Sequence, residues 1–293
     1  MPPEPDTGGT AVIAVIVAYQ SNLDTLAQIA ARLRPQCAII VVDNSPDAAH
    51  AGTISAWAAT TEVDYVAMGG NSGIGAAQNR GIARAWARGA DAVLLLDDDS
   101  LPPPHLVERL LDGAAAAGPD AVVGANAVDA DGSEISNVRG VPGALPHCRD
   151  LMSSGTLIRR AIFERVGPFD EGLFIDGVDF EWGWRAQRLG VSLYVCRATA
   201  IIHRLGQGRA AGAGIPAPIR HYFQYRNMIR LIGARVTPWR WRVEQMVKLP
   251  LKLVLILLFM PRAGVRLRHA AAGIRDGLRG RDGPAPGPRG ARA

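Results

Sequence analysis

The chain has 293 residues, of which 48% are hydrophobic, enough to bury a substantial core in one large domain or two small ones. Its net charge is +5, and Lys248 and Lys252 are the only lysines. This excludes a P-loop of the G-x-x-x-x-G-K type and a Schiff-base lysine in the first 240 residues. Cys37, Cys148 and Cys196 are far apart and predict neither a disulfide framework nor a CxxC pair.

The first ten residues are acidic and rich in proline, and we expect residues 1–10 to be disordered. They lack the basic start and apolar run of a signal peptide. The catalytic part is therefore expected in the cytoplasm.

Strands and helices alternate over the first 125 residues. The predicted strands cover 11–18, 38–43, 63–68 and 92–97. The predicted helices cover 23–33, part of a helix at 54–59, and 75–88. This alternation indicates βαβ units and a mostly parallel α/β sheet, in which ligands bind beyond the carboxyl ends of the strands.

The alternation fades after residue 120. Short strands are predicted at 121–125, 157–159 and 191–196, and helices at 106–111, 178–189 and 219–232. Residues 206–218 are rich in glycine and alanine and predict a mobile loop, and residues 280–293 predict a disordered tail. The predicted organisation is a catalytic domain at 11–232, with halves at 11–125 and 126–232, followed by a helical segment at 233–279.

Residues 239–262 combine a short apolar helix with tryptophans before it and arginines after it. The apolar stretch is shorter than the roughly 20 residues that cross a bilayer. Aromatic and basic flanks favour a helix lying in the membrane interface. A buried helix packed on the domain is the alternative.

Three acids, Asp97, Asp98 and Asp99, directly follow the predicted strand at 92–97. Clustered carboxylates repel one another unless a cation lies between them, and Mg²⁺ or Mn²⁺ prefers such oxygen ligands. A cation there could clamp a diphosphate leaving group. The alternative is that the acids cap the helix at 106–111.

The glycine-rich stretch at 69–75 lies between a predicted strand and a helix, where backbone N–H groups can approach a phosphate. Its spacing also fits the nucleotide loop of short-chain dehydrogenases. That family carries the loop at its first strand and a Tyr-x-x-x-Lys pair, and neither holds here.

Two further features are candidates for chemistry. Asp179 lies near the start of the predicted helix at 178–189, where it is either a capping acid or a general base. His203 is either structural or, if the acids bind a cation, a metal ligand.

In combination, these motifs resemble the family-2 inverting glycosyltransferases of GT-A fold, and more closely their bacterial rhamnosyltransferase branch. The resemblance covers about residues 12–232 and rests on motifs in the family's order. They are Val17-Ala18-Tyr19-Gln20, Val41-Val42-Asp43-Asn44-Ser45, Asn71-x-Gly73-x-Gly75 with Asn79-x-Gly81, Leu95-Leu96-Asp97-Asp98-Asp99-Ser100, Ser154-Gly155, Phe169-Asp170-Glu171-x-Leu173-Phe174-Ile175-Asp176-x-Val178-Asp179-x-Glu181-Trp182, Ile202-His203-x-x-Gly206 and Tyr225-Arg226-Asn227.

The resemblance implies roles for individual residues. Those that would bind the donor are Tyr19, Asp43, Asn71, Gly73, Asn79, Asp97 and Asp98, the last standing where the branch often carries Gln. Those that would bind the acceptor are Ser154, Gly155, Asp176 and Trp182. Asp97, Asp99 and His203 would hold Mg²⁺ or Mn²⁺, and Asp179 would be the catalytic base.

The resemblance also implies the substrates. The expected donor is dTDP-β-L-rhamnose, and the expected acceptor is a hydroxyl of a glycan, carried on a polyprenyl diphosphate of the cell envelope. The enzyme would be peripheral on the inner face of the cytoplasmic membrane, with no nucleic-acid partner. Alternatives are a family-2 transferase using UDP-GlcNAc, UDP-galactose or GDP-mannose, a sugar-1-phosphate nucleotidyltransferase, and a non-catalytic sugar-nucleotide-binding protein.

Overall fold

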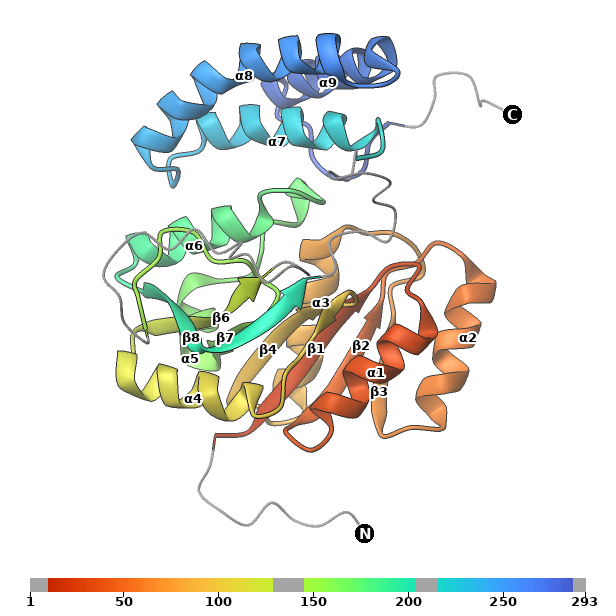
Figure 1. The fold of residues 1–293 in the computed structure, drawn as a ribbon, viewed down its shortest axis with the longest axis vertical. Helices are drawn as coiled ribbons and strands as arrows, with labels where there is room; N and C mark the ends of the chain where they lie inside the picture. The colour runs from red at the N-terminus through yellow and green to blue at the C-terminus, as the bar shows by residue number, and fades with distance from the viewer. Residues whose placement is uncertain (1–9, 129–144, 204–215, 287–293) are drawn as a thin grey trace.

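The structure, a computed structural model, describes residues 10–128, 145–203 and 216–286. The strands in this part of the chain are β1 (Val12–Ala18), β2 (Ala38–Asp43), β3 (Val63–Ala67), β4 (Ala92–Asp97), β5 (Ser100–Leu101), β6 (Ala121–Val128), β7 (Thr156–Arg159) and β8 (Ser192–His203). They form one sheet in the order β3-β2-β1-β4-β7-β6-β8-β5 (Figure 1). The four N-terminal strands β1 to β4 pair in parallel, and β7 joins them antiparallel to β4.

The helices are α1 (Leu23–Leu33), α2 (Ala48–Ala59), α3 (Ile74–Ala87), α4 (Leu106–Ala117), α5 (Arg160–Val166), α6 (Val178–Arg188), α7 (Arg220–Gly233), α8 (Trp239–Phe259) and α9 (Ala263–Leu278), with a 3-10 turn η1 (Glu171–Leu173). The mostly parallel α/β sheet flanked by helices is therefore confirmed. Most predicted bounds agree within two residues. The exceptions are the start of α2, six residues before its predicted part, and the ends of α4, β6 and β8, which lie six, three and seven residues beyond the predicted ends; α5 and β5 were not predicted.

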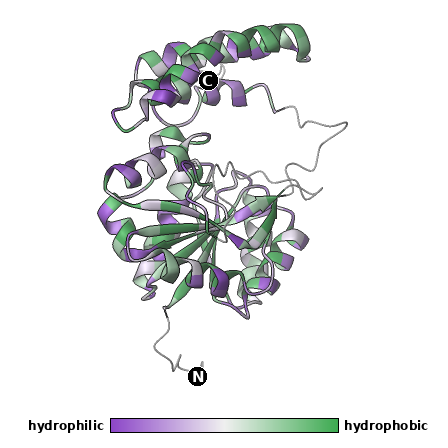
Figure 2. Ribbon diagram, turned by 60° about the vertical axis from the view of Figure 1, so that its left-hand side comes forward, coloured by the Kyte–Doolittle hydropathy of each residue, from purple (hydrophilic) through white to green (hydrophobic). Residues whose placement is uncertain are grey.

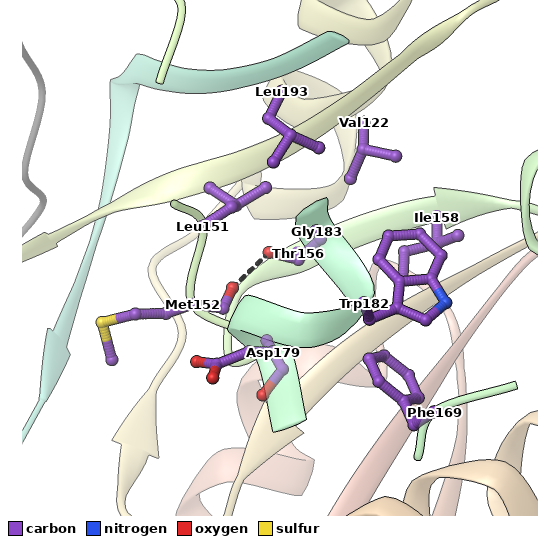
Figure 3. Close-up of a pocket in the computed structure, with 11 residues that line it drawn as sticks. Val122, Leu151, Met152, Thr156, Ile158, Phe169, Asp179, Trp182, Gly183 and Leu193 are labelled. Carbon is purple, nitrogen blue, oxygen red and sulfur yellow. Dashed lines mark hydrogen bonds between the residues drawn. The ribbon is translucent and has the colours of Figure 1, made fainter. Parts of the chain in front are cut away.

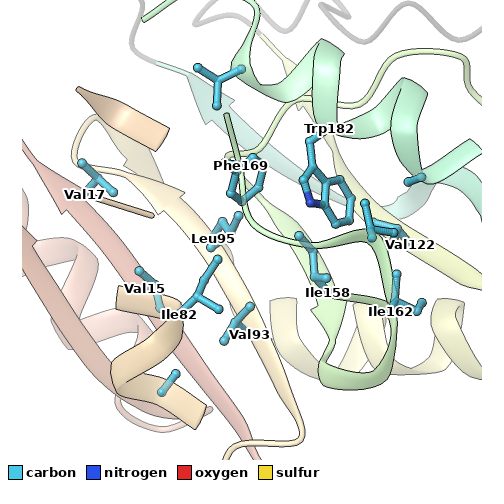
Figure 4. Close-up of a cluster of buried hydrophobic side chains, with 14 of the residues drawn as sticks. Val15, Val17, Ile82, Val93, Leu95, Val122, Ile158, Ile162, Phe169 and Trp182 are labelled. Atoms are coloured by element: carbon cyan, nitrogen blue, oxygen red, sulfur yellow. The ribbon is translucent and has the colours of Figure 1, made fainter. Parts of the chain in front are cut away.

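The sheet is buried on both faces, and side chains of β1 alternate between them. Val15 and its odd-numbered neighbours pack with α3, α5 and α6, and part of this cluster is drawn in Figure 4. Ile16 and its even-numbered neighbours pack with α1, α2 and α4. Every residue of β1 is buried, and each of its Val and Ile side chains stabilises the fold by about 1.5–3 kcal/mol. The continuous apolar run that predicted a doubly covered strand is thereby explained.

Helices α7, α8 and α9 form a separate layer above the carboxyl ends of the strands (Figure 1). Helix α9 lies so close to α7 that a Cβ atom at Gly273 would come within 2.3 Å of the Tyr222 carbonyl oxygen. Buried Asp276 of α9 accepts a hydrogen bond from the Tyr222 hydroxyl at 3.0 Å. The predicted helical segment therefore consists of α8 and α9 packed on α7.

Helix α8 leaves most of its apolar side chains exposed, and Figure 2 shows the hydrophobic colour concentrated along this outer layer. Val247, Leu258 and Phe259 are 68%, 64% and 74% exposed, whereas only Gln245 and Ile256 are buried. The alternative of a buried C-terminal helix therefore does not describe α8. Among the described helices, none is both long enough and apolar enough to cross a membrane.

A loop at 206–218 and a disordered tail at 280–293 were predicted to lack regular structure. The expectation of a disordered tail is wrong for residues 280–286, because the Gly283 amide donates to the Gly172 carbonyl at 2.9 Å and Asp282 pairs with Arg230 at 2.9 Å. Residues 287–293, residues 1–9, and 206–215 of the predicted loop lie outside the described residues.

Candidate active site

The carboxyl ends of three neighbouring strands bring the predicted donor residues to one edge of the sheet. Ala18 of β1 lies beside Asp43 of β2, and Val17 of β1 lies beside Asp97 of β4. Parallel strands end at the same edge, so the loops after β1, β2 and β4 meet there. Tyr19, the first residue of the β1 loop, is 46% exposed.

Asp43 is buried, and both of its carboxylate oxygens have protein partners. The Tyr65 hydroxyl donates to Oδ2 at 2.9 Å, and the Ser45 amide donates to Oδ1 at 2.9 Å. Burial and the adjacent Asp43 carboxylate raise the pKa of Tyr65 to about 12, so Tyr65 stays a neutral donor. Asp43 therefore lies at the end of β2 with both carboxylate oxygens bound by protein groups.

Asn44, to which no role was assigned from the sequence, organises the glycine-rich loop. Its side-chain oxygen accepts from the Ser72 amide at 2.8 Å, and its Nδ2 lies 3.2 Å from the Asn71 side-chain oxygen. The Asn71 oxygen also accepts from the Gly73 amide at 3.1 Å. The available signal was its position directly after Asp43 at a strand end.

Gly73 could not be replaced by another residue without moving its neighbours. Its φ is +91°, a left-handed conformation that glycine adopts at little cost. A Cβ atom there would also lie 2.7 Å from the Phe174 carbonyl oxygen. The loop and the segment before α6 are therefore in direct backbone contact, and the Ile74 amide donates to the Phe174 carbonyl at 2.7 Å.

Asp97, at the end of β4, has the most strongly shifted pKa among the acids of the site. Burial raises its pKa to about 7, and the charges of Asp99, Asp98 and Asp179 contribute. Three other carboxylates thus lie within electrostatic reach of Asp97, although Asp179 is 82 positions further along the chain. The negative charge of this group has a cost that a bound cation would relieve.

Asp98 is hydrogen-bonded to the β1 loop. Its Oδ2 accepts hydrogen bonds from the Tyr19 amide at 2.9 Å and from the Ser21 hydroxyl. Burial raises its pKa, and the Ser21 hydrogen bond opposes that shift. The structure therefore gives Asp98 a contact that the sequence could not assign: it fixes the loop that carries Tyr19.

Ser154 and Gly155 are hydrogen-bonded to the end of β4, next to the acid cluster. The Ser154 hydroxyl oxygen accepts from the Asp97 amide at 3.0 Å, and the hydroxyl donates to Ser100 Oγ at 2.9 Å. The Gly155 amide donates to the Leu95 carbonyl at 2.7 Å. The backbone of His203 pairs with Ser100, directly beside Asp99. Asp99 thus lies next to the β5–β8 pair that contains His203, whereas Asp97 ends β4, which two strands separate from β8.

Asp179 lies in the first turn of α6, in the wall of a small, mainly apolar cavity shared with Leu151, Met152 and Trp182 (Figure 3). In Figure 3 its carboxylate points away from Trp182 and Phe169. Its Oδ1 accepts from the Phe180 amide at 3.0 Å. Burial raises its pKa to about 6, partly opposed by backbone hydrogen bonds, which suits a base working near neutral pH.

Three predicted site residues have protein partners of their own. The Asn79 amide binds the backbone of Phe169 on both its nitrogen and its oxygen, at 3.0 and 2.9 Å. Trp182 is 3% exposed, and its Nε1 donates to the Gly167 carbonyl at 2.8 Å. Asp176 pairs with Arg220 at 2.8 Å. Asn79 and Trp182 therefore hold elements together in this structure, and Trp182 forms the wall behind Asp179.

The predicted metal ligands are Asp97, Asp99 and His203. Within the described residues, no group of three or more His, Cys, Asp or Glu side chains is placed to hold a metal ion. Asp98 is engaged by the β1 loop, so Asp97 and Asp99 are the remaining candidate carboxylates, of which Asp99 accepts a hydrogen bond from the Ser100 hydroxyl at 3.3 Å. Two carboxylates fit a hard divalent cation that takes its remaining ligands from substrate phosphates and water. Burial and the neighbouring carboxylates raise the pKa of Asp97, and a bound cation would lower it.

Comparison with known proteins agrees with this geometry. A family model described as Glycosyl transferase family 2 matches residues 13–167. A dTDP-rhamnosyl transferase, RfbF, of Shigella flexneri is 28% identical over 92% of this chain and 96% of its own length.

Solved structures resemble the chain in fold at lower identity. GalNAc-T7, solved with UDP, GalNAc and Mn²⁺, is 14% identical with a TM-score of 0.62, over 94% of this chain and 57% of that one. Mannosyltransferase PcManGT of Pyrobaculum calidifontis, solved with GDP-Man and Mn²⁺, is 14% identical with a TM-score of 0.54, over 92% and 75%. These likenesses confirm the predicted GT-A fold.

Proposed function

The chain belongs to glycosyl transferase family 2 and is a glycosyltransferase, and we propose that it transfers L-rhamnose from dTDP-β-L-rhamnose to an acceptor hydroxyl with inversion. One observation carries the proposal: Asp97, at the sheet edge where β1 and β2 also end, lies within electrostatic reach of Asp179 of α6. Relation to a dTDP-rhamnosyl transferase over nearly the whole chain supports this donor.

The nucleotide would bind over the ends of β1 and β2. Asp43 lies there, fixed by Tyr65 and Ser45, and exposed Tyr19 is available to cover the base. The loop of Asn71 and Gly73 follows β3, with its turn preorganised by Asn44. A rigid pocket of this kind lowers the entropic cost of ordering the donor.

Asp97 and Asp99 would hold Mg²⁺ or Mn²⁺ together with the donor's diphosphate, and His203 is the further candidate ligand from the resemblance. When bound, the cation supplies positive charge where the diphosphate leaves. Asp98 would act on the donor side indirectly, through the β1 loop that it binds.

Asp179 would take the acceptor's proton. As the acceptor oxygen forms its bond to the anomeric carbon, the bond to the diphosphate breaks, and the hydroxyl proton passes to the Asp179 carboxylate. A carboxylate with a raised pKa is a stronger base than an exposed one, and at neutral pH it is still ionised. A single displacement of this kind inverts the configuration.

We propose that the acceptor is a lipid-linked glycan, and that α8 holds the enzyme at the membrane that carries this acceptor. The exposed apolar residues of α8 and the basic residues Lys248, Lys252 and Arg262 suit a helix lying in an anionic membrane surface. Such a placement would hold the enzyme at the inner face of the cytoplasmic membrane, where the sheet edge could reach the glycan.

A donor panel tests the function. Nucleoside diphosphate release is measured with dTDP-rhamnose, UDP-GlcNAc, UDP-galactose and GDP-mannose, with Mg²⁺ or Mn²⁺ and a membrane-lipid extract as acceptor. We expect turnover with dTDP-rhamnose and its loss in Asp179→Asn. Strong turnover with a UDP-hexose and none with dTDP-rhamnose would replace the donor but keep the transferase.

A further inference from the structure

The backbone between η1 and α6 is unusual for a stretch with non-glycine residues. Phe174 and Asp176 have φ values of +64° and +66°, and Gly177 follows with +93°. Residues with side chains rarely adopt this region, and they keep it only where surrounding contacts enforce it. This segment, 172–177, leads directly into α6 and lies two residues before Asp179.

Helix α7 supplies those contacts. Buried Asn227 places its side-chain Nδ2 2.8, 2.6 and 2.8 Å from the carbonyl oxygens of Leu173, Ile175 and Asp176. The Asn227 side-chain oxygen accepts from Arg226 Nε at 2.9 Å, which fixes the orientation of the amide.

The neighbouring residues of α7 extend this grip. Arg226 is fully buried and donates to the carbonyls of Gly172 and Leu173 at 3.1 and 2.8 Å. The Phe223 ring stacks on Phe174 with ring centres 4.9 Å apart. Side chains of α7 therefore hold segment 172–177, together with the Gly283 amide on the Gly172 carbonyl, and none of these α7 residues is near the acid cluster in sequence.

The opposite side of the segment touches the donor loop. The Phe174 carbonyl accepts from the Ile74 amide at 2.7 Å, and Gly73 leaves no room for a Cβ atom beside it. The segment thus lies between the glycine-rich loop and α7, with Asp179 at its end. Its conformation sets where Asp179 stands relative to the donor pocket.

We propose that Asn227 is a positioning residue, which holds segment 172–177 in its left-handed conformation and thereby aligns Asp179 with the donor site. This rests on the proposed role of Asp179 as base. Without the amide, the three carbonyls lose their shared donor, and Phe174 and Asp176 relax towards ordinary conformations. A displacement of about 1 Å at a reacting group can reduce the rate about 100-fold.

The test compares Asn227→Ala with Tyr225→Phe, two residues earlier on the same helix. The Tyr225 hydroxyl is buried and has no hydrogen-bond partner among the described residues, so its removal is a matched control. Steady-state kcat and KM for the donor are measured, with the stoichiometry of nucleoside diphosphate binding giving the folded fraction. Arg220→Gln, at a half-exposed residue that pairs with Asp176, is a second variant that does not threaten folding.

We expect Asn227→Ala to lower kcat about 30- to 100-fold, with KM for the donor within about threefold and binding stoichiometry unchanged. Arg220→Gln should lower kcat by a smaller factor, and Tyr225→Phe should keep it. Full kcat in Asn227→Ala with an inactive Asp179→Asn would overturn the positioning role alone. A kcat loss matched by an equal loss of binding stoichiometry would also overturn it, because misfolding would then explain the result. Full kcat in Asp179→Asn would instead overturn the proposed base.

Discussion

Replacing Asp179 by Asn should remove activity and stabilise the protein at the same time. Burial moves the pKa of Asp179 from an ordinary 3.8 to about 6, so the folded state disfavours the charged carboxylate that the reaction needs. A tenfold change in an equilibrium constant is about 1.4 kcal/mol, so this shift corresponds to a cost of about 3 kcal/mol at pH 8. Asn is neutral at every pH and keeps an oxygen for the Phe180 amide.

The sign follows from proton binding. Between pH 4 and 6 the folded protein binds more protons at Asp179 than the unfolded chain does, so this group's contribution to stability decreases as pH rises through that window. Above about pH 6 the loss is complete. Asp179→Asn should therefore exceed the wild type by up to about 3 kcal/mol at pH 8, and the difference should vanish near pH 4.

Urea titrations at pH 4, 6 and 8, without metal or donor, measure this difference as the free energy of unfolding. Asp112→Asn, which removes an exposed acid of α4, controls for the general loss of one negative charge. If Asp179→Asn is no more stable than the wild type at pH 8, or if its advantage does not change with pH, then Asp179 is not desolvated as described.

The other predictions concern the pH dependence of kcat, the β1 loop that Asp98 binds and the exposed apolar surface of α8. The kcat of the wild type should rise with pH through about 6, because Asp179 must be ionised to accept a proton, and a flat profile between pH 5 and 7 would contradict this. Asp98→Ala should raise the donor KM about tenfold with a smaller effect on kcat, because the β1 loop loses its anchor; an unchanged KM in a kinetic assay would refute the role. Val247→Glu/Leu258→Glu should abolish co-sedimentation with anionic vesicles while keeping donor hydrolysis, whereas undiminished sedimentation would show that α8 is not the attachment surface.

The fold could be predicted where the pattern is local and strong. The strands β1, β2 and β4 are continuous apolar runs, which is the common sequence pattern of a strand buried on both faces. The start of α2 was missed although Asp47 caps it, with its side chain accepting from the Ala49 amide. Strand β5, two residues long, exists only because β8 lies beside it. Such elements depend on tertiary contacts that the sequence does not display.

The site shows the same division. Asp97 and Asp179 could be chosen from motif and strand end, and their proximity is visible only in the fold. Asp98 was expected at the donor, but its side chain binds Ser21, 77 positions away, a contact that the sequence does not display. Asn79 was expected at the donor but binds Phe169, 90 positions away. Local patterns therefore suggested the candidate reactive groups, whereas the residues that contact them could be found only in the three-dimensional arrangement.

The configuration of the product tests the central claim most directly. With dTDP-β-L-rhamnose and the lipid-linked acceptor, the anomeric one-bond carbon–hydrogen coupling of the transferred sugar is measured by NMR. Single displacement with Asp179 as base predicts an α-L-rhamnoside from the wild type and none from Asp179→Asn. A β-linked product, or an α-linked product formed at the full rate by Asp179→Asn, would contradict the account.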